Sequence, residues 1–129
     1  MKIKSFAIVL FLLALNTMNG QATMEKWTAL KAFHEVMSQT FHPSEEGNLE
    51  PIKARSEELM NRATDLLKSD IPEDFKTTAI LASAEKLQLK SKALYRLVAA
   101  KGSDANIKSS LSELHDVFHE IVGLCSEKK

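Results

Sequence analysis

The residues best suited to chemistry in this 129-residue chain are its four histidines, which fall into two groups far apart in the sequence. His34 and His42 belong to the amino-terminal part, and His115 and His119 belong to the carboxyl-terminal part. The second pair has the spacing H-x-x-x-H, which places both imidazoles on one face of a helix and within reach of one ion. The pattern favours a transition-metal site, of the copper or zinc type, built from these four residues.

A plainer interpretation stands beside this one. His115 and His119 would then be surface residues on the flank of an amphipathic helix, and His34 a core residue satisfied by one hydrogen bond. The concentration of all four histidines in two segments is what favours ligation. The segment from His115 to His119 lacks the glutamate of the zinc-protease motif H-E-x-x-H. Because no activated nucleophile, phosphate-binding loop or carboxylate pair is recognisable, we predict that the chain is not an enzyme.

Two sulfur-containing residues could assist the histidines. Met37 lies one helical turn from His34, where its thioether would suit copper, although a methionine at this position also suits core packing. Cys125 is the only thiol, so it forms no internal disulfide, and the haem-attachment motif C-x-x-C-H is absent. Three roles fit Cys125: a small buried hydrophobe, which we favour, a soft metal ligand, or a thiol that links two chains into a dimer.

The elements that must position these residues are helices. Apolar residues recur at steps of three and four, as on the first predicted helix at Trp27, Leu30, His34, Met37 and Phe41. We predict a first helix at about 24–41, ending before Pro43, and a second from about Leu49 or Pro51 to 68. A third runs from about Pro72 or Phe75 to 100 and ends at Lys101 and Gly102. A fourth helix, capped by Ser103 or Asp104, reaches Cys125.

Short connections between long helices predict an all-α, up-down-up-down four-helix bundle. The first and last helices are then antiparallel neighbours. Counted from the ends of these helices, His34 should lie within about 4 to 5 Å in height of His115, at 1.5 Å per residue. The sequence therefore predicts that the imidazoles of His34, His115 and His119 converge.

The amino terminus has the pattern of a cleavable export signal. Lys2 and Lys4 precede an uncharged apolar run at 6–15, which is shorter than the roughly 20 residues that a membrane-spanning helix needs. Gly20 and Ala22 provide small residues for cleavage. We expect a signal peptide at 1–22 and one domain at 23–129, soluble in the periplasm or secreted, with no membrane attachment after cleavage.

The net charge of the chain limits the classes of partner that it can bind. Without Lys2 and Lys4, the 17 basic residues fall to 15 against 17 acidic ones, which gives a net charge of −2. Basic and acidic residues alternate along every segment, and a nucleic-acid surface would need a basic excess or a basic cluster. We therefore expect no nucleic-acid partner. The partners that we expect instead are a metal ion and a periplasmic redox or metal-handling protein.

In its length, export signal and four-helix pattern, the mature chain resembles the cytochrome b562 family of small periplasmic haem bundles. That family binds haem through a methionine near the start of the first helix and a histidine near the end of the last. Met24 and His119 match those places, with Met37 as the other methionine that could serve. The resemblance implies a b-type haem electron carrier. A third hypothesis is an interaction module without a cofactor.

Overall fold

The computed structural model describes residues 22–127, so the predicted signal peptide lies outside the described residues except for Ala22. Four long helices and one short 3-10 helix follow in the order α2 (Thr28–Glu45), α3 (Glu50–Lys68), η1 (Glu73–Phe75), α4 (Thr78–Ala99) and α5 (Asp104–Glu127). Between residues 22 and 127 there is no β-strand. The prediction of an all-helical chain is confirmed.

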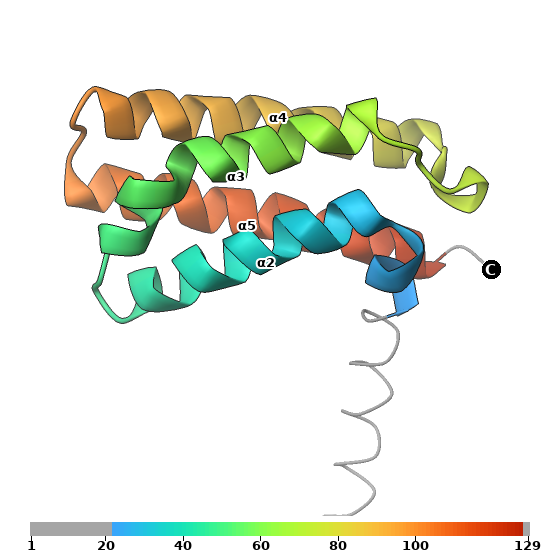
Figure 1. The fold of residues 1–129 in the computed structure, drawn as a ribbon, viewed down its shortest axis with the longest axis horizontal. Helices are drawn as coiled ribbons and strands as arrows, with labels where there is room; N and C mark the ends of the chain where they lie inside the picture. Colours follow the sequence, from blue (N-terminus) through green and yellow to red (C-terminus); the bar gives the residue numbers. More distant parts are fainter. Residues whose placement is uncertain (1–21, 128–129) are drawn as a thin grey trace, which may run out of the picture.

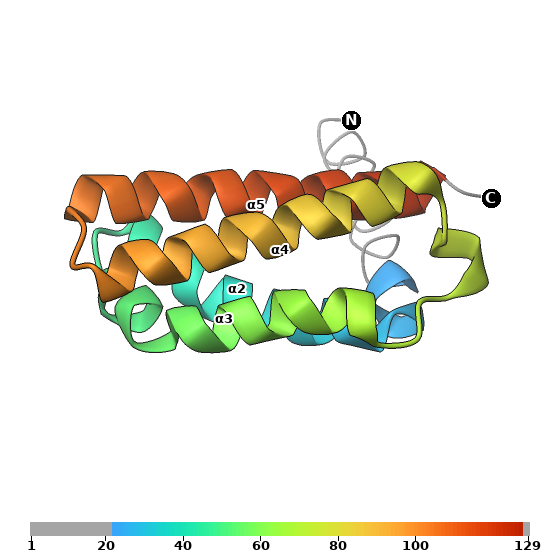
Figure 2. The same cartoon turned by 90° about the horizontal axis from the view of Figure 1, so that it is seen from above.

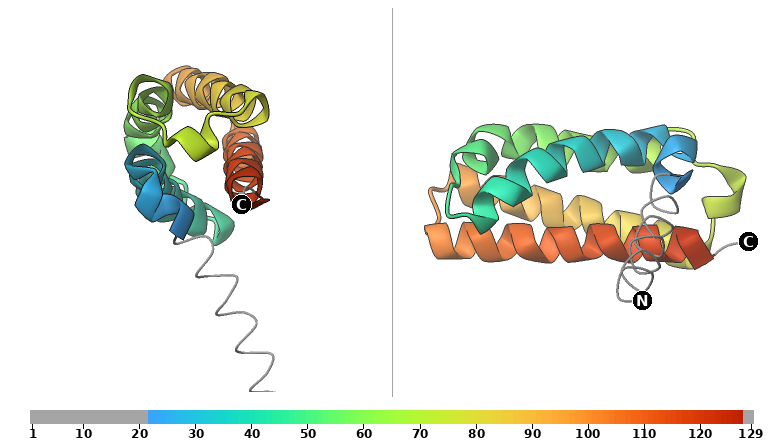
Figure 3. Two further views of the ribbon diagram at one scale, coloured as in Figure 1. Left: turned by 90° about the vertical axis from the view of Figure 1, so that its right-hand side faces the viewer. Right: turned by 90° about the horizontal axis from the view of Figure 1, so that it is seen from below.

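The four helices form a bundle in which consecutive helices run antiparallel and pack side by side (Figures 1 and 2). Viewed from its end, the bundle is a ring in which α2 and α5 close the circle (Figure 3). Of the four contacts between neighbouring helices, the one between α2 and α5 is the least extensive. The first and last long helices are thus neighbours, as expected, but the contact between them is loose.

The limits of α2 differ from the prediction at both ends. The helix begins at Thr28 because Trp27 leaves helical geometry, with φ −114° and ψ 89°. It runs through Pro43 to Glu45, so the prediction that it ends before Pro43 is wrong. Proline removes only one backbone donor here, in the last turn of the helix. The end is then closed because Gly47, at φ +91°, lets the Asn48 N–H donate to the Pro43 carbonyl at 2.9 Å.

The third long helix also starts later than predicted. Residues 73–75 form the separate helix η1, and α4 begins at Thr78. Thr77 caps it, since its Oγ1 accepts a hydrogen bond from the Ile80 N–H at 3.2 Å. A threonine at this position satisfies one of the free backbone donors of the first turn, and this fixes the start of the helix.

The turn between α4 and α5 sets the position of the last helix. Lys101 adopts the left-handed conformation, with φ 59°, and the Gly102 N–H donates to the Leu97 carbonyl at 2.9 Å. Gly102 has no room for a side chain, because a Cβ there would lie 2.4 Å from Leu97 Cδ1. Ser103 caps α5 by accepting a hydrogen bond from the Asn106 N–H at 3.1 Å. The predicted end and the predicted serine cap are both confirmed.

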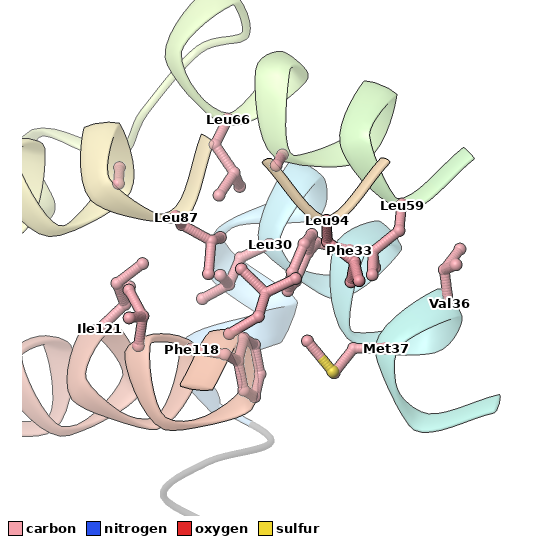
Figure 4. Close-up of a cluster of buried hydrophobic side chains, with 14 of the residues drawn as sticks. Leu30, Phe33, Val36, Met37, Leu59, Leu66, Leu87, Leu94, Phe118 and Ile121 are labelled. Atoms are coloured by element: carbon pink, nitrogen blue, oxygen red, sulfur yellow. The ribbon is translucent and has the colours of Figure 1, made fainter. Parts of the chain in front are cut away.

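All four helices contribute to one hydrophobic core (Figure 4). Trp27 is fully buried at one end, where its ring packs against Phe75 with centroids 6.0 Å apart. The other buried apolar residues are Leu30, Phe33, Val36, Met37, Leu49, Ile52, Leu59, Ala63, Leu66, Ile80, Ala84, Leu87, Leu94, Ile107, Leu111, Leu114, Val117, Phe118, Ile121 and Cys125. None of the helices among residues 22–127 combines the length and apolar character needed to cross a membrane.

Candidate metal site

All four histidines lie where α2 meets α5. His34 and His42 are on α2, and His115 and His119 are on α5. We call this region the α2–α5 seam and define it by six side chains: His34, Phe41, His42, His115, Phe118 and His119. Because α2 and α5 are the least closely packed neighbours, these side chains are only partly covered by the two helices, apart from Phe118, which is buried.

The two histidines of α5 are in direct contact. Their Nε2 atoms lie 3.1 Å apart, and their rings meet edge to face with centroids 4.4 Å apart. One ring donates its N–H to the free nitrogen of the other. Two imidazole nitrogens bound to one tetrahedral zinc at 2.0–2.1 Å are roughly 3.3 Å apart. The histidine pair, His115 and His119, therefore has nearly the spacing of two ligands on one ion before any ion binds.

Phe41 holds the first ring of the histidine pair in place. Its ring lies parallel to the imidazole of His115, with centroids 3.7 Å apart and an angle of 4° between the planes. Aromatic contacts of this kind add about 0.5–1.5 kcal/mol to the burial of the rings. The ring of Phe118 contacts the imidazole of His119 edge to face, with centroids 5.6 Å apart and an angle of 67° between the planes. Both imidazoles are thus oriented by a phenylalanine, one from α2 and one from α5.

His34 lies one step further along the seam than the sequence predicted. It stacks on Phe118, with centroids 5.2 Å apart, and not on His115. The extra turn of α2, which reaches Glu45, would by itself have brought His34 level with His115. The ends of the two helices are not level, however, because Phe41, close to the end of α2, lies against His115, which is well inside α5. Phe41 occupies the place opposite His115 that the sequence had assigned to His34.

The electrostatics of the seam favour neutral imidazoles. Burial is the main cause that lowers the pKa of His115 below 6.5, helped by repulsion from a proton on His119 and, more weakly, on His42. Burial is also the main cause that lowers the pKa of His34, again with repulsion from His119 and His42. Both rings are therefore neutral at pH 7, which is the form that binds metal ions.

The structure brings together two of the predicted metal ligands. Within residues 22–127, no group of three or more His, Cys, Asp or Glu side chains is placed to hold a metal ion. His42 is exposed and meets the edge of Phe41 at 5.8 Å, so it borders the seam without joining the histidine pair. What the structure offers is a site with two imidazoles and open positions for further ligands.

No protein-family model matches this chain, and the searches of curated proteins and of solved structures find no match. The resemblance to cytochrome b562 stays a prediction.

Of the methionines that this resemblance implies, one lies in the core and the other lies beside His34. Met37 is only 1% exposed and its sulfur points into the core (Figure 4). Met24 is half-buried and lines a shallow hollow of about 390 Å³ together with His34. For a haem iron to join His119 to Met37, the core at this seam would have to open.

Cys125 is 3% exposed, as the favoured interpretation of this residue predicted. Burial raises the pKa of its thiol to about 11. A protonated, buried thiol is unreactive, so this fold does not present Cys125 for a disulfide with a second chain.

Proposed function

We propose that this chain is exported and binds a transition-metal ion, of the copper or zinc type, through the histidine pair of α5. One observation supports this above all others: the two Nε2 atoms already lie 3.1 Å apart, with the His115 ring held against Phe41. A site that is organised before binding loses little conformational entropy when the ion arrives. In this proposal His34 and His42 shape the surroundings of the pair and are not ligands.

A site with two imidazoles suits transfer of an ion better than permanent storage. Structural zinc sites are closed by four protein ligands, whereas the two imidazoles of one chain leave positions on the ion open to ligands from another protein. His119 is exposed, so an incoming or departing ligand has direct access to the ion. We propose that the protein carries the ion outside the cytoplasm and passes it to a metal-handling protein there.

The predicted export signal at 1–22 supports this proposal. Beyond the inner membrane, the histidine pair would meet ions without competition from the reducing, thiol-rich cytosol. Export itself is tested by expressing the full chain and determining the amino-terminal residue of the protein recovered from the periplasm or medium. We expect Thr23. Recovery of a chain that still begins at Met1 would overturn this part of the proposal.

Metal binding is tested on the same exported protein. We expect copper or zinc in stoichiometric relation to the chain, lost in a His115→Ala, His119→Ala double variant and retained in a His42→Ala variant. A Soret band in the visible spectrum would instead establish haem. If no ion is bound and added copper and zinc leave the melting temperature unchanged, the proposal fails and an interaction module remains, since an ion bound only by the folded state must raise stability.

A further inference from the structure

The histidine pair provides only half of the ligands that zinc requires. Tetrahedral zinc takes four ligands, and the described part of the chain brings no third metal-binding side chain to the pair. We propose that a second copy of this chain completes the site: one zinc ion is held by His115 and His119 of each copy, in a dimer with two-fold symmetry. This inference rests on the proposed function and adds the partner and the metal.

The outer surface of α5 leaves room for such a partner. One turn to either side of the pair on the same face of α5, the exposed or half-exposed residues are Ser112, Val122 and Gly123, while the exposed carboxylates of Asp116 and Glu120 flank the pair. A Cβ added at Gly123 would meet no atom within 4 Å, so the space beside it is open. Within one turn along this face, no bulky exposed side chain of α5 therefore stands between the histidine pair and the same pair on a second copy.

Two-fold symmetry accounts for the ligand set with no further residue. In a symmetric dimer each copy presents the same surface to the other, so a pair of imidazoles necessarily faces an identical pair. Four neutral imidazoles are a suitable ligand set for zinc. The negative charges of Asp116 and Glu45 raise the pKa of His115 and so partly oppose the effect of burial. The same two carboxylates would partly balance the positive charge of the ion.

The geometry of zinc also predicts how the two helices cross. Residues at i and i+4 are stacked along the helix, so the line joining the two Nε2 atoms follows the axis of α5. In a tetrahedral site the two ligand pairs lie in perpendicular planes, and the two α5 helices must therefore cross steeply. A steep crossing restricts the contact to the residues around the metal. The dimer should consequently depend on zinc and separate without it.

The mass of the exported protein during a zinc titration tests this inference. Sedimentation equilibrium or light scattering should show a monomer in EDTA. Zinc sulfate should double the mass, with saturation at one zinc for every two chains and reversal by EDTA. The midpoint should move to lower zinc concentration as the protein concentration is raised, because two chains combine with one ion.

Variants separate the dimer from the metal site itself. His119→Ala should abolish the doubling, whereas Glu85→Ala, which removes an exposed side chain of α4 outside the seam, should leave it intact. If zinc binds at one ion per chain without a change of mass, the dimer is refuted while the proposed function stands. If equilibrium dialysis shows no bound zinc, both fail. A His115→Ala, His119→Ala variant that still doubles its mass with zinc would also refute the dimer.

Discussion

Replacing Phe41 by leucine should weaken metal binding although Phe41 contributes no ligand. The wild-type ring lies 3.7 Å from that of His115 and only 4° from parallel, so leucine removes the surface that fixes the imidazole. The stacking contributes about 0.5–1.5 kcal/mol, and this sets the upper limit of the loss. The dissociation constant should therefore rise by about 2- to 12-fold, since about 1.4 kcal/mol corresponds to tenfold.

A competition titration with a chromophoric chelator measures this change directly. Phe41→Tyr keeps the ring and should bind nearly as tightly as wild type, which separates loss of stacking from any disturbance of α2. His119→Ala removes a ligand, so its loss should exceed the roughly 10- to 100-fold that is typical of residues that only orient a ligand. Equal affinities in wild type and Phe41→Leu would refute the idea that the stack prepares the site. So would a loss in Phe41→Leu as large as that in His119→Ala.

Three further predictions concern stability and reactivity. Burial lowers the pKa of His34 and His115 below 6.5 in the folded protein, so these histidines take up protons in the unfolded chain first as the pH falls. The melting temperature should therefore decrease below about pH 6.5 and level off once the imidazoles of the folded protein are protonated as well. His34→Gln should reduce that decrease, and an unchanged pH profile would contradict this assignment. In urea unfolding, Lys101→Gly should raise the free energy of unfolding by about 1 kcal/mol, because lysine is strained at φ 59°. Gly102→Ala should lower it by about 1–3 kcal/mol, because the added methyl group would collide with Leu97. If the two variants had the opposite effects, the conformation assigned to this turn would be wrong. Burial raises the pKa of the Cys125 thiol to about 11, so iodoacetamide at pH 8 should alkylate this thiol only after the protein is denatured. Rapid labelling of the folded protein would show instead that the thiol is accessible.

The helical bundle could be predicted because its signals are local. The spacing of apolar residues along α2 and α5 identified both helices and the residues that they bury, including Trp27 at the end of the core. The end of α4 followed from Lys101 and Gly102, although the left-handed position is taken by the lysine and the glycine is needed for space. Helix periodicity and turn chemistry carry this information within a few residues.

The register between α2 and α5 could not be predicted in the same way. It depends on where the end of α2 lies along α5, and the continuation of α2 through Pro43 to Glu45 would by itself only have brought His34 level with His115. The offset between the ends of the two helices instead places His34 on Phe118 and Phe41 against His115. Phe41 was recognisable only as an apolar residue on the inner face of α2. Its place in the site follows from contacts between helices, which sequence spacing does not encode.

The most direct test of the proposed metal site compares two matched double variants in one titration. Both remove two histidines from the α2–α5 seam: His115→Ala with His119→Ala on α5, and His34→Ala with His42→Ala on α2. Binding of Cu(II) and Zn(II) is measured by isothermal titration calorimetry on each exported protein at pH 7. We predict that the α2 variant keeps the wild-type stoichiometry and that the α5 variant gives no binding heat. Binding that survives in the α5 variant, or that is lost only in the α2 variant, would contradict the assignment of the site to His115 and His119.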